Sequence, residues 1–233
     1  MNIYFLVEGQ SSEADIYPAW ISYLIPELKR VENFDEVNQN NYYLFSSYGI
    51  PYIENDIINA IIDINSLGSY DYFVICIDAD AATVYQREAK IHKLIEEYNI
   101  SLVNNTTLKL IVQNRCIETW FLGNRKIYTR NPQKNPCFIK YSNYYNVSKN
   151  DPELMEKFEN FKGSISNFHF TYLKAMFNER GKMAYSKSNS IEVQRVTYLN
   201  ELIKRIKEEP SQLISFVNFI DFCSKIRCEI NSC

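Results

Sequence analysis

Short apolar runs alternate with amphipathic segments along the first half of the chain. In the amphipathic segments the apolar residues recur at helical spacing, which predicts helices, whereas the short apolar runs predict buried strands. Alternation of the two predicts βαβ units and a mostly parallel sheet between helices. The predicted strands lie in residues 2–9, 42–47, 70–81 and 108–114, and the predicted helices in 13–28, 53–68, 83–99 and from 116 onwards.

The pattern changes after about residue 125. The following stretch is polar, aromatic and proline-containing, with no clear period, and predicts an irregular connection. Amphipathic helices return in the last part of the chain, where Pro210 separates two of them. We therefore expect an α/β fold with a mainly helical C-terminal region. The expected parts are a catalytic domain at 1–125, a basic and aromatic connection at 126–152, and a helical region at 153–233.

Composition narrows the classes of function. The chain has 25 Lys and Arg against 28 Asp and Glu, a net charge of −3, so it is not a generally basic nucleic-acid binder. Contact with nucleic acid would require a local basic patch or a metal ion. No apolar run is long enough for a membrane span or signal peptide. The six cysteines form no CxxC pair, which disfavours structural zinc and is typical of a cytoplasmic protein.

Acidic residues stand where two of the predicted strands end. Glu8 ends the first apolar run, and Asp78 and Asp80 end the run at 70–81. The carboxyl ends of parallel strands meet at one edge of a sheet, so these carboxylates converge if their strands are neighbours. Such a cluster repels itself unless a hard cation such as Mg²⁺ or Mn²⁺ binds it. Each motif alone also suits an ordinary turn or solvated loop, and Glu13 equally suits the first turn of a helix.

These residues carry a resemblance to a known family. The segment FLVEGQSSEADIY, followed by VICIDADA, resembles the two signature motifs of the Toprim superfamily. The segment QNRCIETWFLGN is similar to one in small stand-alone Toprim proteins of bacterial anti-phage loci, the OLD-type and RloB-type relatives, and Glu118 matches its acidic residue. Residues 183–199 resemble the C-terminal part of the RloB-type group, with Lys187 as a basic contact. The chain departs from the pattern at Thr119, and at Gln10 and Ser11, where a threonine is common.

The resemblance implies a metal-dependent nuclease that cleaves phosphodiester bonds in DNA or RNA, in bacterial anti-phage defence. In that interpretation Asp78 and Asp80 hold Mg²⁺ or Mn²⁺, and Glu8 completes the shell or acts as general base. Glu13 and Glu118 would support a second ion, as in two-metal sites. A partner ATPase encoded nearby is a further expectation of the resemblance.

The predicted connection contains a candidate surface for nucleic acid. Its basic residues alternate with tyrosines, a composition that can hold phosphates and stack bases. An ordinary solvated loop whose tyrosines pack against the body explains the same composition. The candidate nucleic-acid-binding residues are Arg125, Lys126, Arg130 and Lys187.

Two other functions stay open. One is a regulatory or binding module of Toprim type that does not cut. The other is a haloacid-dehalogenase-like phosphatase, whose strand-end motif also contains two aspartates. In DADAATV the threonine comes one residue late, and the motif lies on a later strand than in those phosphatases.

Overall fold

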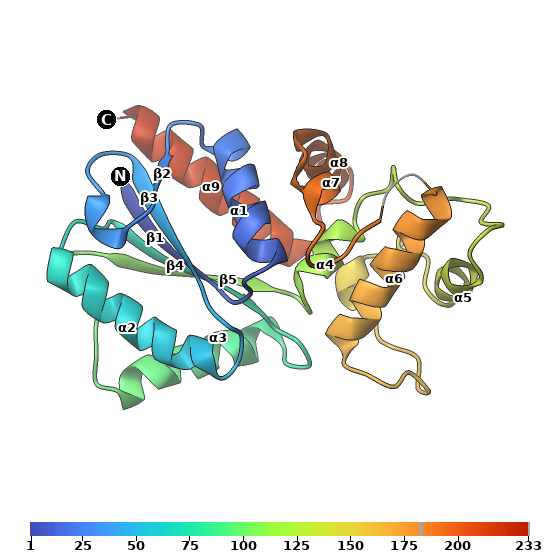
Figure 1. The fold of residues 1–233 in the computed structure, drawn as a ribbon, viewed down its shortest axis with the longest axis horizontal. Helices are drawn as coiled ribbons and strands as arrows, with labels where there is room; N and C mark the ends of the chain where they lie inside the picture. The colour runs from blue at the N-terminus through green and yellow to red at the C-terminus, as the bar shows by residue number, and fades with distance from the viewer. Residues whose placement is uncertain (182–183, 233) are drawn as a thin grey trace. The chain divides into compact units, whose positions relative to one another are not determined.

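The computed structural model describes residues 1–181 and 184–232, and it confirms the α/β fold with a mainly helical C-terminal region. A five-stranded, all-parallel sheet in the order β2-β3-β1-β4-β5 lies between helices (Figure 1). The short strand β2 was not predicted, because it has only three residues, of which two are exposed. The strands are β1 (Asn2–Val7), β2 (Lys29–Val31), β3 (Asn41–Ser46), β4 (Tyr72–Asp78) and β5 (Thr107–Gln113).

The central strand β1 is buried along its whole length, as its unbroken apolar sequence predicts. It pairs in parallel with β3 on one side and β4 on the other. In these ladders Val7 lies opposite Ser46 and Cys76. The strands that precede Glu8 and carry Asp78 are therefore neighbours, which was the condition for the predicted acidic site.

The chain divides into two compact units. The first comprises Met1–Ile77, Val84–Val112 and the chain from Asn218 onwards, whereas the second comprises Asp78–Thr83 and Gln113–Val217. The first unit therefore contains the sheet except for the last residues of β4 and β5, which group with the second unit.

Helices cover both faces of the sheet in the first unit. Figure 1 shows α2 and α3 on one face, and α1 with the C-terminal part of α9 on the other. Helix α9 packs through Phe219 against Tyr17 and Trp20 of α1. Gly68 ends α2 in the left-handed conformation, which glycine adopts without steric cost. The helices are α1 (Ser12–Leu24), the short η1 (Phe34–Glu36), α2 (Tyr52–Leu67), α3 (Val84–Glu97) and α9 (Ile214–Ser232).

The second unit is helical and has its own aromatic core. Tyr141 and Tyr172 lie with ring centres 5.0 Å apart, and Tyr141 and Phe168 4.8 Å apart, where α5 packs on α6. A second group of rings joins Phe121 to Tyr185 and Tyr198. The helices are α4 (Ile117–Phe121), α5 (Pro136–Tyr144), the short η2 (Pro152–Leu154), α6 (Ile165–Arg180), α7 (Ile191–Gln194) and α8 (Val196–Glu208).

The segment 126–152, expected to be irregular, contains helix α5. Pro136 stands at its first turn, and the Asn135 side chain accepts hydrogen bonds from the backbone N–H groups of Cys137 and Phe138. Phe138 and Tyr141 are its buried residues. Two buried positions in nine residues are too few to give a helical period in the sequence.

Within residues 1–181 and 184–232, no helix combines the length and the apolar character needed to cross a bilayer.

Candidate functional site

Two of the predicted acids, Glu8 and Glu13, lie in the first unit. Glu8 directly follows β1; its backbone N–H donates to the carbonyl of Cys76, and its own carbonyl accepts from Gly49. Glu13, in the first turn of α1, is buried. Its carboxylate lies against the α-carbon of Gly9, at a place that a β-carbon on residue 9 would fill. The Glu-Gly pair thus leaves room beside Glu8 for a second carboxylate.

The charge of Glu13 acts on Cys76 in the sheet. Burial raises the pKa of the Cys76 thiol, and the Glu13 carboxylate raises it further, against the hydrogen bond of Tyr17. Cys76 lies in β4, two residues before Asp78. The negative charge of Glu13 therefore acts close to the carboxyl end of β4.

The loop that carries Asp78 and Asp80 is held by backbone hydrogen bonds in the second unit. The N–H of Ala79 donates to Gln113 and that of Asp80 donates to Arg115, so the loop is fixed to the segment after β5. Asp80 has φ +53°, a left-handed conformation that aspartate adopts more readily than most residues. Both aspartates are half-buried, and Oδ1 of Asp78 is itself buried.

Specific contacts orient Asp80. The Ser166 hydroxyl, from α6, donates to Oδ1 of Asp80 over 2.5 Å. The Arg115 guanidinium donates to the Asp80 backbone carbonyl over 3.4 Å and forms an ion pair with Glu156. A cation therefore lies beside the loop, and a hydroxyl holds one oxygen of its second aspartate.

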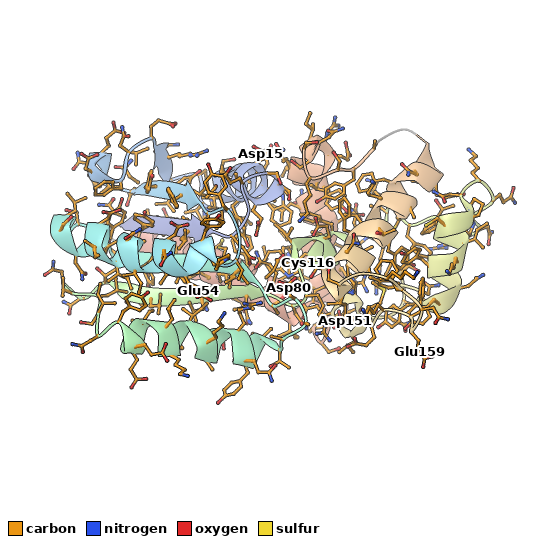
Figure 2. All side chains as sticks on the ribbon, turned by 60° about the horizontal axis from the view of Figure 1, so that its bottom comes forward. Asp15, Glu54, Asp80, Cys116, Asp151 and Glu159 are labelled. Carbon is orange, nitrogen blue, oxygen red and sulfur yellow. The ribbon has the colours of Figure 1, made fainter. Side chains whose placement is uncertain are left out.

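Glu118 lies on the short helix α4 and is buried, with 2% of its surface exposed. Its Oε1 accepts a hydrogen bond of 3.1 Å from the Tyr185 hydroxyl. The Cys116 thiol, at the N-terminus of α4, is affected by the charges of both Glu118 and the aspartate loop. Burial raises the pKa of this thiol well above its usual value, and the carboxylates of Glu118 and Asp78 raise it further. Two predicted acids from separate motifs thus lie near one buried sulfur; Figure 2 labels Asp80 and Cys116 in this unit.

A buried chain of hydrogen bonds fixes the start of α4. The Cys116 N–H donates to the Thr119 hydroxyl. The Nε2 of His169 lies 2.9 Å from the Met155 carbonyl, which can only accept, so Nε2 carries the proton. Nδ1 therefore accepts from the Thr119 hydroxyl, 2.8 Å away. Burial lowers the His169 pKa to about 4, so this imidazole is neutral at pH 7 and has a structural role.

A second buried network lies under the same helix. Trp120 of α4 donates through Nε1 to the Ser215 hydroxyl over 2.7 Å, and that hydroxyl donates to Glu153 over 2.6 Å. Burial raises the Glu153 pKa to about 7, against the hydrogen bonds from Ser215 that lower it. Helix α4 is thus held on one side through His169 and on the other through Ser215.

The predicted acids have the right chemistry for a metal, because carboxylate oxygens are the preferred ligands of Mg²⁺ and Mn²⁺. The structure divides them: Glu8 and Glu13 belong to the first unit, and Asp78, Asp80 and Glu118 to the second. In the part of the chain that the structure describes, no group of three or more His, Cys, Asp or Glu side chains is gathered closely enough to hold a metal ion. The metal site therefore stays a prediction.

The predicted nucleic-acid-binding residues differ in their surroundings. Arg125 forms ion pairs with Glu208 and Glu209, at 3.3 and 3.2 Å, and Lys126 with Glu201 at 3.6 Å. Acidic residues of α8 and the residue after it thus partly neutralise two of these cations. Arg130 and Lys187 are exposed.

The tyrosines of the segment 126–152 also differ in their exposure to solvent. Tyr128 and Tyr141 are buried, as the solvated-loop interpretation expects, whereas Tyr144 is 45% exposed. The segment at 183–199 that carries Lys187 begins at Met183, which lies outside the described residues.

Three residues of the second unit were not predicted as parts of the site: Ser166, Tyr185 and His169. They reach the motif residues Asp80, Glu118 and Thr119 across 86, 67 and 50 positions. No local spacing signals such contacts. Arg115, by contrast, directly precedes Cys116, and its place inside the motif segment could have identified it.

Comparison with protein-family models, curated proteins and solved structures finds no match to this chain. The resemblance to Toprim proteins therefore rests on the motif residues of the sequence alone.

Proposed function

We propose that this chain is a metal-dependent nuclease of Toprim type that hydrolyses phosphodiester bonds in DNA or RNA, in bacterial anti-phage defence. The observation that carries the proposal is the pairing of the Asp78–Asp80 loop with the segment that leads to Glu118, through backbone hydrogen bonds from Ala79 to Gln113 and from Asp80 to Arg115. The two acids come from separate motifs, and the carboxylates of both raise the pKa of the Cys116 thiol. In open α/β folds, ligands bind beyond the carboxyl ends of the parallel strands.

The arrangement of the strands adds support. A Glu-Gly pair follows β1, an Asp-Ala-Asp sequence ends β4, and these strands are neighbours in the sheet. The two Toprim signature motifs stand in this order, each at the end of a parallel strand. The role of Glu8 as general base or metal ligand is carried over from the motif alone.

In the proposed reaction, water adds to phosphorus and one ester P–O bond breaks. A carboxylate accepts a proton of the water, and the leaving oxygen takes up a proton from solvent to form a hydroxyl. Bound Mg²⁺ or Mn²⁺ would supply Lewis acidity at the phosphate oxygens. Asp78 and Asp80 would hold the ion, with Glu118 in support. Ser166 keeps Oδ1 of Asp80 in one orientation, and Tyr185 does the same for Oε1 of Glu118. Neither Ser166 nor Tyr185 needs to contact the substrate.

Incubation with labelled DNA, tRNA and total RNA, with Mg²⁺, Mn²⁺ or EDTA, tests the proposal. We expect cleavage of at least one substrate that requires the metal and is lost in Asp80→Asn. Asp221→Asn is a matched control, because Asp221 is an exposed residue of α9 in the other unit. No metal-dependent cleavage, even with the products of neighbouring genes present, would favour the binding module that does not cut.

A further inference from the structure

The second unit contains a pocket that no catalytic motif uses. It has a volume of about 400 Å³, within the range of about 300–1,000 Å³ that is typical of small-molecule sites. Its walls come from the segment after α4 and from the turn after α5. We call it the basic pocket; its lining residues are Arg125, Tyr128, Arg130, Asn146, Ser148 and Lys149.

The lining is positively charged, although the chain as a whole has a net charge of −3. Arg125, Arg130 and Lys149 are cations, and none of the lining residues is acidic. Arg130 and Lys149 are exposed, and the described residues contain no ion pair of either. Ion pairs with Glu208 and Glu209 fix the Arg125 guanidinium at the wall. The pocket therefore offers two solvent-facing cations and one that is held in place.

One wall of the pocket is a rigid turn. The N–H and the hydroxyl of Ser148 both donate to Oδ1 of Asn146. The N–H groups of Lys149 and Asn150 donate to the Asn146 carbonyl. Lys149 is thus presented from a fixed backbone, which lowers the entropic cost of binding a ligand.

A buried arginine supports this turn from inside. Arg205 has 1% of its surface exposed, and its guanidinium donates to the carbonyls of Val147 and Asn150. Burial lowers the Arg205 pKa to about 10, and the charge of Arg125 lowers it further in the same direction. The charges of Asp151 and Glu209 act in the opposite direction and raise the Arg205 pKa.

From this geometry we infer that the basic pocket binds the phosphate groups of a nucleotide-sized ligand. Guanidinium groups bind phosphate oxygens through paired, charge-assisted hydrogen bonds, and a lysine adds a point charge. Such a phosphate belongs to a nucleotide unit of a nucleic-acid strand or to a free nucleotide. The inference concerns binding alone and holds whether or not the chain cleaves its ligand.

Binding measurements in the presence of EDTA test the pocket without any contribution from a metal site. The ligands are inorganic phosphate, ADP and a short 5′-phosphorylated oligonucleotide, titrated by calorimetry at low salt. The test variant is Arg130→Glu with Lys149→Glu, both at exposed positions. The matched control is Lys162→Glu with Lys174→Glu, which makes the same charge change at exposed lysines of the same unit, outside the pocket.

We expect the test variant to weaken binding by about tenfold or more and to flatten its dependence on salt, while the control stays near the parent. Binding of ADP identifies a free nucleotide as the ligand, and binding of the oligonucleotide alone identifies a strand; either result supports the inference. Equal losses in test and control variants, or no binding of any of these ligands to the parent, would overturn it. Circular dichroism of both variants verifies that they fold.

Discussion

The Ser166 hydroxyl of α6 donates a hydrogen bond of 2.5 Å to Oδ1 of Asp80, across 86 positions of sequence. This contact fixes the acidic loop at the end of β4 to α6 within the second unit. If Asp80 holds a metal, Ser166 decides which oxygen is presented.

Ser166→Ala should therefore misorient Asp80 without removing its charge. We expect metal-dependent cleavage to fall by about tenfold, and the free energy of unfolding to fall by about 1 kcal/mol, because a hydrogen bond to a half-buried carboxylate is lost. Ser166→Thr, which keeps the hydroxyl, should restore most of the activity. Ser224→Ala is the control, since the exposed Ser224 hydroxyl donates to the carbonyl of Ile220 within α9. Equal activity of Ser166→Ala and the parent would show that Ser166 does not position Asp80.

His169 should make stability depend on pH. Its pKa is about 4 in the folded chain, below the ordinary value of about 6.5, so the unfolded chain binds a proton first as pH falls. The contribution of the neutral His169 to the free energy of unfolding is fully present above pH 6.5. It is lost as pH falls towards 4, by up to roughly 3 kcal/mol.

Urea unfolding of the parent and of His169→Gln between pH 7 and 4 measures this contribution. We expect a shallower pH dependence in the variant. His92→Gln serves as the control, because His92 is exposed. Parallel curves for the parent and His169→Gln would contradict the neutral, buried imidazole.

Glu153 should make stability depend on pH in the direction opposite to that of His169. Its pKa is about 7 in the folded chain, above the usual 4.5, so the folded chain holds the proton longer as pH rises. The contribution of Glu153 to the free energy of unfolding is fully present below pH 4.5. It is lost as pH rises towards 7, by up to roughly 3 kcal/mol. Glu153→Gln keeps an acceptor for Ser215 and removes the titration.

The Glu153→Gln variant should thus exceed the parent in free energy of unfolding at pH 8, and the difference should disappear near pH 4.5. Chemical denaturation at the two pH values measures it. A variant that is less stable than the parent at pH 8 would show that the ionised carboxylate is needed. Because the His169 and Glu153 effects have opposite signs between pH 4.5 and 6.5, only variants separate them.

Gly9→Ala should displace the Glu13 carboxylate, which occupies the place of the new methyl group. We expect a cost of roughly 1 kcal/mol, since Glu13 is buried and has little room to move. In a Glu13→Ala background the same substitution should cost less. A double-mutant cycle by thermal unfolding gives the coupling energy. A coupling of zero would mean that the two residues do not share this space.

Much of the first unit could be predicted from local pattern. The strands β1 and β4 are unbroken apolar runs, and the acids that end them follow directly in the sequence. Strand β2 and helix α5 could not be predicted, because each is short and has few buried residues.

The surroundings of the candidate site could be predicted only in part. The acids were identified because strand ends and motif spacing are local features. Their hydrogen-bond partners Ser166 and Tyr185 come from another part of the chain, brought close by the packing of the helical unit. The ion pairs that Arg125 and Lys126 form with acidic residues of α8 and Glu209 are long-range as well. A basic run in a sequence therefore does not reveal which of its charges remain available to a ligand.

The cleavage rate of Glu8→Gln separates a Toprim nuclease from a phosphatase that uses Asp78. The substitution keeps size and hydrogen bonding at residue 8 and removes its charge and basicity. A Toprim nuclease needs this glutamate as much as either aspartate, whereas a phosphatase that uses Asp78 as nucleophile does not. We predict that metal-dependent cleavage of nucleic acid falls by roughly two orders of magnitude or more, with the free energy of unfolding unchanged. Cleavage by Glu8→Gln at close to the parental rate would contradict it.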